Sequence, residues 1–148
     1  MLTVSRISNH DARILISAGA DKARELGVPM CIAVTDEAGH LIAFDRMDGA
    51  KISSISIAID KAFTAAAARN ATSVYNQLCQ PGQPTFGIHV TNQGHFCVIG
   101  GGLPIIVEGV VVGGIGVSAG TAAQDIECAE GAVAQFFEKT GYQAGANA

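Results

Sequence analysis

The stretch GGGLPIIVEGVVVGGIGVS, from Gly100 to Ser118, decides the fold. Three glycines lead into an apolar run at residues 105–107, and a second, β-branched run follows at residues 110–117. Because only a Glu-Gly pair separates the two runs, the stretch predicts a β-hairpin. Glycine inside a strand marks a place where another backbone or a ligand comes close. The hairpin is therefore the first place to look for a site.

The composition predicts one globular domain over residues 1–148. Hydrophobic residues make up 49% of the chain and charged residues only 15%, which excludes a disordered protein. The net charge of −4 and the absence of Lys or Arg runs exclude a nucleic-acid partner. No apolar run reaches the roughly 18 residues that span a bilayer, and no secretory signal is visible, so we expect a cytoplasmic protein without a membrane partner. Such low charge further predicts a homo-oligomer.

The four cysteines do not predict a metal centre. They lie far apart in the sequence, with no C-x-x-C pair, and no two histidines have the spacing of H-E-x-x-H. Most of the cysteines sit in apolar segments, where a thiol is a small core residue. We therefore expect no metal site.

The remaining patterns predict helices packed on a mostly antiparallel sheet, in the α/β (α+β) class. One helix begins at a capping box after Ser8 and ends at Gly27, and the closing helix lies between Thr121 and Gly141. The other expected elements are strands at residues 30–35, 41–44 and 96–99, a helix at about residues 52–69, a short helix at about 72–79, and a segment at 86–91 that suits a strand or a turn.

Several blocks of the sequence together form a recognisable pattern: VTDEAG at 34–39, RMD at 46–48, SS at 53–54, KA at 61–62, QPG at 80–82, GGGLP at 100–104, and residues 113–118 with QD at 124–125. In their order and spacing these blocks resemble the GlcG/HbpS family, which includes PduO-type C-terminal domains and small OrfY-like proteins. The resemblance covers the chain from about residue 4 to residue 137. Ala119 departs from it, because the family usually has glycine after the serine.

The resemblance implies a profilin-like fold, with a five-stranded antiparallel sheet and helices on both faces. It also implies homo-oligomers, from dimers to octamers. Members of the family differ in function: some bind haem, some are fused to corrinoid enzymes, and some resemble enzymes that act on unstable catabolic intermediates. The family alone does not choose between these functions.

Three basic or glycine-rich features could bind an anion. Residues Gly100, Gly101 and Gly102 could present backbone N–H groups to an anion, or could simply allow close packing. Arg46 could hold a substrate carboxylate in a bidentate fork, or could form an ion pair with a neighbouring subunit. Lys61 could bind an acid or act as a base at the edge of a pocket, or could lie on a solvated helix face.

Three further residues complete the candidate site. Asp125 could be a catalytic carboxylate, although the helix dipole also explains an acid in a first turn. His89, between two apolar residues, could be a general base, an axial haem ligand or a structural residue. His10, His40 and His95 are expected in solvent. Ser118 fits the letters of G-x-S-x-G, but a hairpin strand and the lack of a later histidine exclude a hydrolase triad and leave a ligand-binding role.

These residues predict a protein that binds a small anionic organic ligand of a catabolic pathway. We expect an enzyme that hydrolyses, deaminates or isomerises a reactive carboxylate, with Arg46, Lys61, His89 and Asp125 as catalytic groups and no required cofactor. One alternative is a haem- or corrinoid-binding protein without turnover, which the scarcity of aromatic residues disfavours. Another alternative is a regulatory or scaffold subunit.

Overall fold

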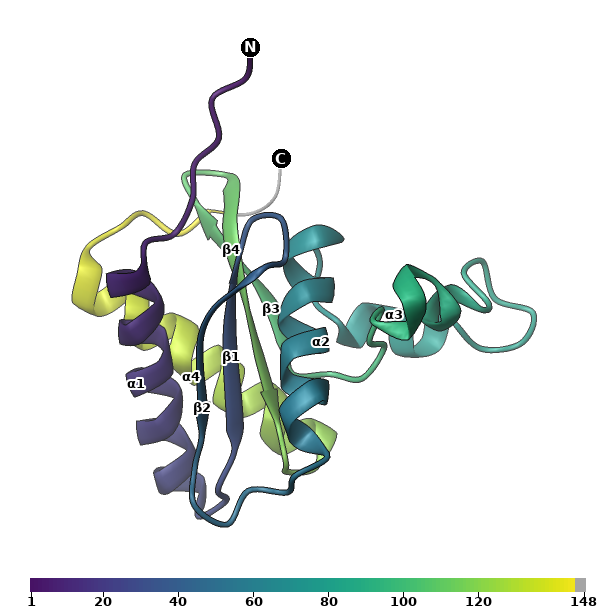
Figure 1. Cartoon of the computed structure of the whole chain (residues 1–148), viewed down its shortest axis with the longest axis horizontal. Helices are drawn as coiled ribbons and strands as arrows, with labels where there is room; N and C mark the ends of the chain where they lie inside the picture. The colour runs from purple at the N-terminus through teal and green to yellow at the C-terminus, as the bar shows by residue number, and fades with distance from the viewer. Residues whose placement is uncertain (146–148) are drawn as a thin grey trace.

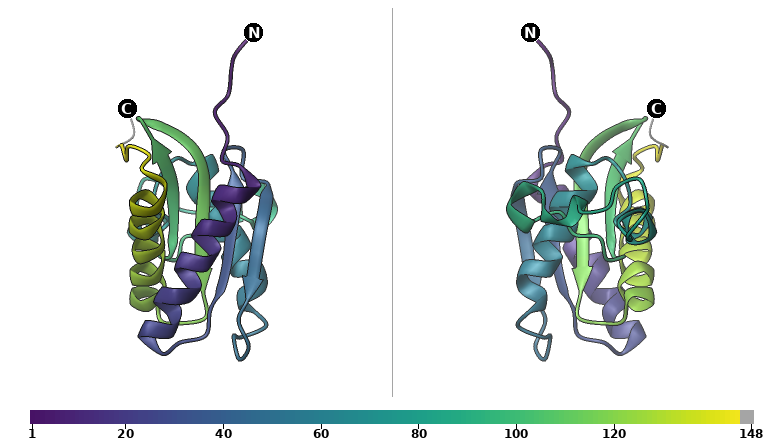
Figure 2. Two further views of the ribbon diagram at one scale, coloured as in Figure 1. Left: turned by 90° about the vertical axis from the view of Figure 1, so that its left-hand side faces the viewer. Right: turned by 90° about the vertical axis from the view of Figure 1, so that its right-hand side faces the viewer.

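The computed structural model describes residues 1–145 and contains one sheet of four antiparallel strands in the order β2-β1-β4-β3. Helices α1 and α4 cover one face of this sheet and α2 covers the other (Figure 1, Figure 2). The predicted class and the helices on both faces are confirmed, with four strands instead of five. The main elements are α1 (Asn9–Leu26), β1 (Cys31–Asp36), β2 (Leu41–Arg46), α2 (Ser54–Ala67), α3 (Ser73–Leu78), β3 (Gly102–Val107), β4 (Val110–Ser118) and α4 (Ala122–Thr140).

The predicted ends of the two long helices are confirmed. Ser8 caps α1 and Thr121 caps α4, each through a reciprocal capping box with the side chain three residues later. Gly27 and Gly141 end these helices in the left-handed conformation, where glycine carries no steric penalty. These local signals place the helices without help from the rest of the fold.

The hairpin of β3 and β4 is also confirmed. Glu108 and Gly109 form its two-residue turn, and both have positive φ, at 51° and 80°. Two positive φ values are typical of the type I′ turn, whose twist matches that of the adjoining strands.

The strand expected at residues 96–99 is wrong. Side chains of α2, of α3 and of the residue before α3 bind its backbone groups in place of a neighbouring strand. Cys97 N–H donates to Thr64, the Val98 carbonyl accepts from Asn76, and the Ile99 carbonyl accepts from Thr72. The ambiguous segment at 86–91 contains a short 3₁₀ helix, η1 (Ile88–Val90), followed by η2 (Asn92–Gly94).

Helix α2 packs directly against β4 because small residues face each other there. A Cβ at Gly114 would lie 2.5 Å from the Ala62 carbonyl oxygen, so only glycine permits this approach. Ala58 and Ala62 of α2 pack with Cys31 and Ala33 in the smaller of two core clusters. Among residues 1–145, no helix combines the length and the apolar character that a membrane span requires.

Candidate functional site

Lys61 and Asp125 form an ion pair in the interior of the protein. Lys61 Nζ lies 2.8 Å from Asp125 Oδ2 and donates a second hydrogen bond, also 2.8 Å long, to the carbonyl oxygen of Val117. The other carboxylate oxygen, Asp125 Oδ1, accepts a hydrogen bond from Gly120 N–H. The lysine is 1% exposed and the aspartate 3%. The pair thus joins α2, the end of β4 and the first turn of α4.

The glycine triplet covers this ion pair. A Cβ at Gly101 would lie 3.0 Å from Lys61 Nζ and 2.6 Å from the Val117 carbonyl oxygen. A Cβ at Gly100 would meet Ile126, and one at Gly102 would meet the Lys61 carbonyl oxygen. Protein atoms therefore fill the space that a ligand would need, and Lys61 is not on a solvated face. In this arrangement the pair connects elements of the fold, and Lys61 offers no surface to a solute.

Arg46 lies in a different place, at the end of the edge strand β2. Arg46 is opposite Cys31 in β1, and Cys31 is opposite Ser118 in β4, so these residues share one row across the sheet. The Ser118 hydroxyl donates to Ser54 Oγ over 3.2 Å, which places this row on the α2 face. Burial raises the pKa of the Cys31 thiol, and the nearby Arg46 charge opposes that shift. The ion pairs and hydrogen bonds among residues 1–145 do not join Arg46 to Lys61.

His89 is exposed in η1, in the segment that stands out from the body of the protein (Figure 1). The sequence left residues 86–91 open between a strand and a turn, and the neighbouring Val90 is 69% exposed. The structure therefore separates His89 from the buried pair of Lys61 and Asp125.

His95, which the sequence predicts to lie in solvent, contacts a carboxylate of α2. His95 Nδ1 lies 2.8 Å from Asp60 Oδ1, and the His95 side chain is 58% exposed. Thr64 fixes the same corner, because its hydroxyl donates to the Asp60 carbonyl oxygen and accepts from Cys97 N–H. The charge-poor sequence of α2 makes Asp60 conspicuous, but nothing in the sequence indicates that residue 95 would meet it.

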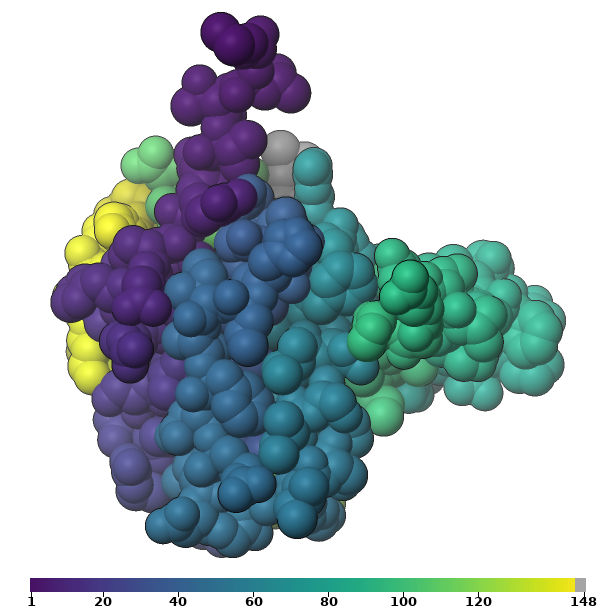
Figure 3. Space-filling model, in the orientation of Figure 1, coloured from purple at the N-terminus to yellow at the C-terminus, as the bar shows by residue number. Residues whose placement is uncertain are grey.

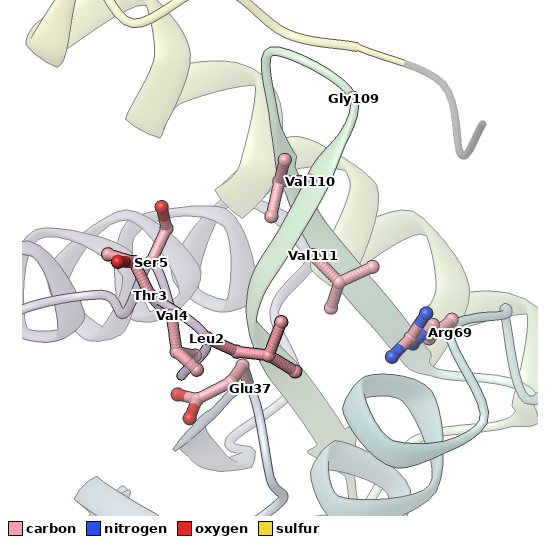
Figure 4. Close-up of a pocket in the computed structure, with 9 residues that line it drawn as sticks. All are labelled: Leu2, Thr3, Val4, Ser5, Glu37, Arg69, Gly109, Val110 and Val111. Carbon is pink, nitrogen blue, oxygen red and sulfur yellow. The ribbon is translucent and has the colours of Figure 1, made fainter.

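A surface hollow of about 610 Å³ lies elsewhere (Figure 4). It separates the N-terminal segment, residues 2–5, from the tip of the β3–β4 hairpin at residues 109–111, with Glu37 and Arg69 at its sides. None of the candidate residues from the sequence lines this hollow.

The family model described as haem-degrading protein HbpS-like matches residues 7–134. The chain belongs to the HbpS-like family. A relative from Citrobacter freundii, an uncharacterised 15.0 kDa protein of the dhaT-dhaS intergenic region, is 38% identical over 91% of this chain and 95% of its own length. The corrinoid adenosyltransferase PduO of Salmonella typhimurium is 34% identical over 86% of this chain, which spans only 38% of that enzyme.

Two solved structures have the same fold as this chain. The ORFY protein of Klebsiella pneumoniae is 35% identical, with a TM-score of 0.89 over 92% of this chain and 94% of its own. PduOC in complex with haem is 31% identical, with a TM-score of 0.87 over 97% of this chain and 99% of its own. The fold of this chain is therefore one on which a related protein holds haem.

Proposed function

We propose that this HbpS-like protein binds haem, with His95 as the axial ligand of the iron. The likeness to a haem-bound relative makes haem the first ligand to consider. The observation that carries the proposal is the contact between His95 and Asp60, because a histidine that binds a metal usually has its second ring nitrogen held by a carboxylate.

The residues around His95 fit such a group. Asp60 engages Nδ1, which leaves Nε2 for the iron, and the exposure of the ring gives access from outside. The side chains of α2 around Asp60 are uncharged and small or apolar: Ser56 and Ala67 are exposed, and Ile59 and Phe63 are half-buried. A porphyrin needs an axial donor and an apolar surface, and this corner of the protein offers both.

In this proposal His95 and Asp60 have separate roles. His95 holds the iron, and Asp60 fixes the orientation of the imidazole and increases its basicity. Bound haem supplies an iron centre that exchanges electrons or takes a small sixth ligand. Thr64 keeps the segment carrying His95 against α2, because its hydroxyl donates to the His95 carbonyl oxygen and accepts from Cys97 N–H.

A carboxylate clamp made by Arg46 and Lys61 has less support. Lys61 donates to Val117 and Asp125 in the interior, and the glycine triplet closes over it. A catalytic role for Lys61 would require this buried pair to open, which would leave an unpaired charge in a place that is shielded from water. Within residues 1–145, the paired Lys61 and Asp125 therefore offer the enzymatic hypothesis no open catalytic groups.

Titration with haemin, followed by the Soret absorption band, tests the proposal. We expect the wild-type protein to bind haemin, His95→Ala to lose most of the affinity, and Asp60→Asn to weaken binding by about 10–100-fold. His89→Ala and His40→Ala are the matched controls and should bind like the wild type. Haem binding itself is refuted if the wild type gives no Soret change. The assignment of His95 is refuted if His95→Ala binds normally or if only His89→Ala loses binding.

A further inference from the structure

The backbone groups along the β3 edge of the sheet are largely occupied. At one end of this edge, the segment at residues 143–145 bonds to the backbone of residues 106–108. At the other end, Thr72 N–H donates to the Gly102 carbonyl oxygen. Pro104, in the middle of β3, has no N–H group to offer. The β3 edge is therefore closed to an additional strand.

The opposite edge, formed by β2, is open. Met47 N–H donates to the Met30 carbonyl oxygen, and hydrogen-bonded pairs alternate along an antiparallel ladder. By this alternation the backbone groups of Asp45 point to β1, and those of Phe44 and Arg46 point away from the sheet. Among residues 1–145, no hydrogen bond from outside the sheet reaches the backbone of Phe44 or Arg46. An open edge of this kind is a template for an added strand.

A groove of about 370 Å³ runs beside this edge, between α1 and β2. Figure 3 shows β2 at the surface of the protein, between α1 and α2. The side chains of Ile16, Ala20 and Ala43 in the groove are small or apolar. Because side chains alternate along a strand, a strand added to β2 would place every second side chain over this groove.

Two arginines of α1 line the groove and can bind carboxylates. Arg13 donates to Asn9 Oδ1, and Arg24 pairs with Asp21. A guanidinium group has five N–H donors, so each arginine keeps donors for a further acceptor. Asp45, which also lines the groove, disfavours an acidic side chain directly beside it.

The spacing of the arginines sets the pattern of a suitable ligand. Arg13 and Arg24 are three helical turns apart on the same side of α1, roughly 16 Å at 1.5 Å per residue. An extended chain rises about 3.3 Å per residue, and side chains on one side of it are an even number of residues apart. Two carboxylates about four to six residues apart therefore reach both arginines.

We propose that the β2 edge binds an extended, acidic segment of another protein, which joins the sheet as a fifth strand. The main chain of the segment bonds to Phe44 and Arg46, and its carboxylates bind Arg13 and Arg24. A second copy of this chain suits the edge less well, because two β2 edges side by side would bring arginines of α1 against arginines. Figure 3 shows the segment with η1 and η2 on the other side of α2, so the proposal does not depend on haem.

A labelled peptide, Thr-Glu-Thr-Val-Thr-Glu-Thr-Val, tests the proposal by fluorescence anisotropy with the haem-free full-length protein. We expect a Kd below about 1 mM, and at least about fivefold weaker binding when lysine replaces both glutamates. The double variant Arg13→Glu/Arg24→Glu should prefer the lysine peptide, a reversal that a folding defect cannot produce. Lys139→Glu, on α4, is the matched control and should keep the wild-type preference. If the wild type does not bind the glutamate peptide, or binds both peptides equally, the proposal is overturned.

Amide hydrogen exchange, followed by NMR, tests whether the bound peptide forms a strand. At ten times the Kd, the glutamate peptide should slow exchange at Phe44 and Arg46 by about tenfold, whereas Asp45 is already bonded to β1 and should change less. Binding without slower exchange at Phe44 and Arg46 would mean that no strand is added, which overturns the proposal. Slow exchange at these residues without peptide, lost on dilution, would show that a second copy covers the edge and would equally overturn it.

Discussion

Breaking the ion pair of Lys61 and Asp125 should strongly destabilise the protein. Asp125→Ala leaves the ammonium group of a lysine that is 1% exposed with only the Val117 carbonyl as partner, and Lys61→Met leaves the carboxylate with only Gly120 N–H. Removing one partner of a buried pair costs about 3–5 kcal/mol. A domain of this size has about 5–15 kcal/mol of total stability, so the loss corresponds to a drop of roughly 6–20 °C in the midpoint of thermal unfolding.

Thermal and urea unfolding followed by circular dichroism would measure this loss. The double variant Lys61→Met/Asp125→Leu should recover most of it, because apolar residues of similar volume need no charge partner. Glu127→Ala is the matched control on the same helix. The Glu127 side chain is 56% exposed and lies 3.5 Å from Lys22 Nζ, so the midpoint should hardly move. The reasoning is refuted if Asp125→Ala costs less than about 1 kcal/mol, the cost of a surface pair.

Three further predictions concern backbone strain and a buried thiol. Gly101→Ala should cost more than about 2 kcal/mol in urea unfolding, because Gly101 has a φ of 119° and its new Cβ would lie 2.6 Å from the Val117 carbonyl oxygen. Gly82→Ala, with a φ of 84° but nothing within 4 Å, is its control and should cost less; equal losses would contradict the steric argument. Ala119→Gly should stabilise the protein by about 0.5 kcal/mol. Ala119 has a φ of 118°, and the relief of this backbone strain outweighs the lost burial of the methyl group and the added entropy of the unfolded chain. A loss of stability above about 1 kcal/mol in urea unfolding would contradict this. Burial raises the pKa of the Cys128 thiol to about 12, from 9.0, so the folded state holds this proton more tightly than the unfolded chain and stability should fall as pH rises from 9 to 12. Thermal midpoints between pH 8 and 11 should decline less steeply in Cys128→Ala than in the wild type, and parallel slopes would count against the effect.

The elements that the sequence predicts well are those with local causes. The capping box at Ser8, the left-handed glycine at residue 27 and the positive φ values of the Glu108-Gly109 turn all arise within a few residues. The departure at Ala119 was also visible in the sequence, and the structure gives it a physical meaning, because alanine there adopts a φ that favours glycine.

The elements that the sequence does not predict depend on distant contacts. The backbone of residues 97–99 bonds to Thr64, Asn76 and Thr72, and no periodicity in that segment reveals those partners. The burial of Lys61 depends on Asp125, which lies 64 residues away in the chain. His95 became a candidate only when the fold brought it to Asp60. Residues 146–148 lie outside the part of the chain that the structure describes.

Chemical rescue of His95→Gly by imidazole tests the central claim most directly. If His95 holds the haem iron, this variant should bind haemin weakly and with an altered absorption spectrum, and millimolar imidazole should restore the spectrum of the wild-type complex. His89→Gly, treated in the same way, should look like the wild type before imidazole is added. A wild-type spectrum from His95→Gly without imidazole would contradict the account.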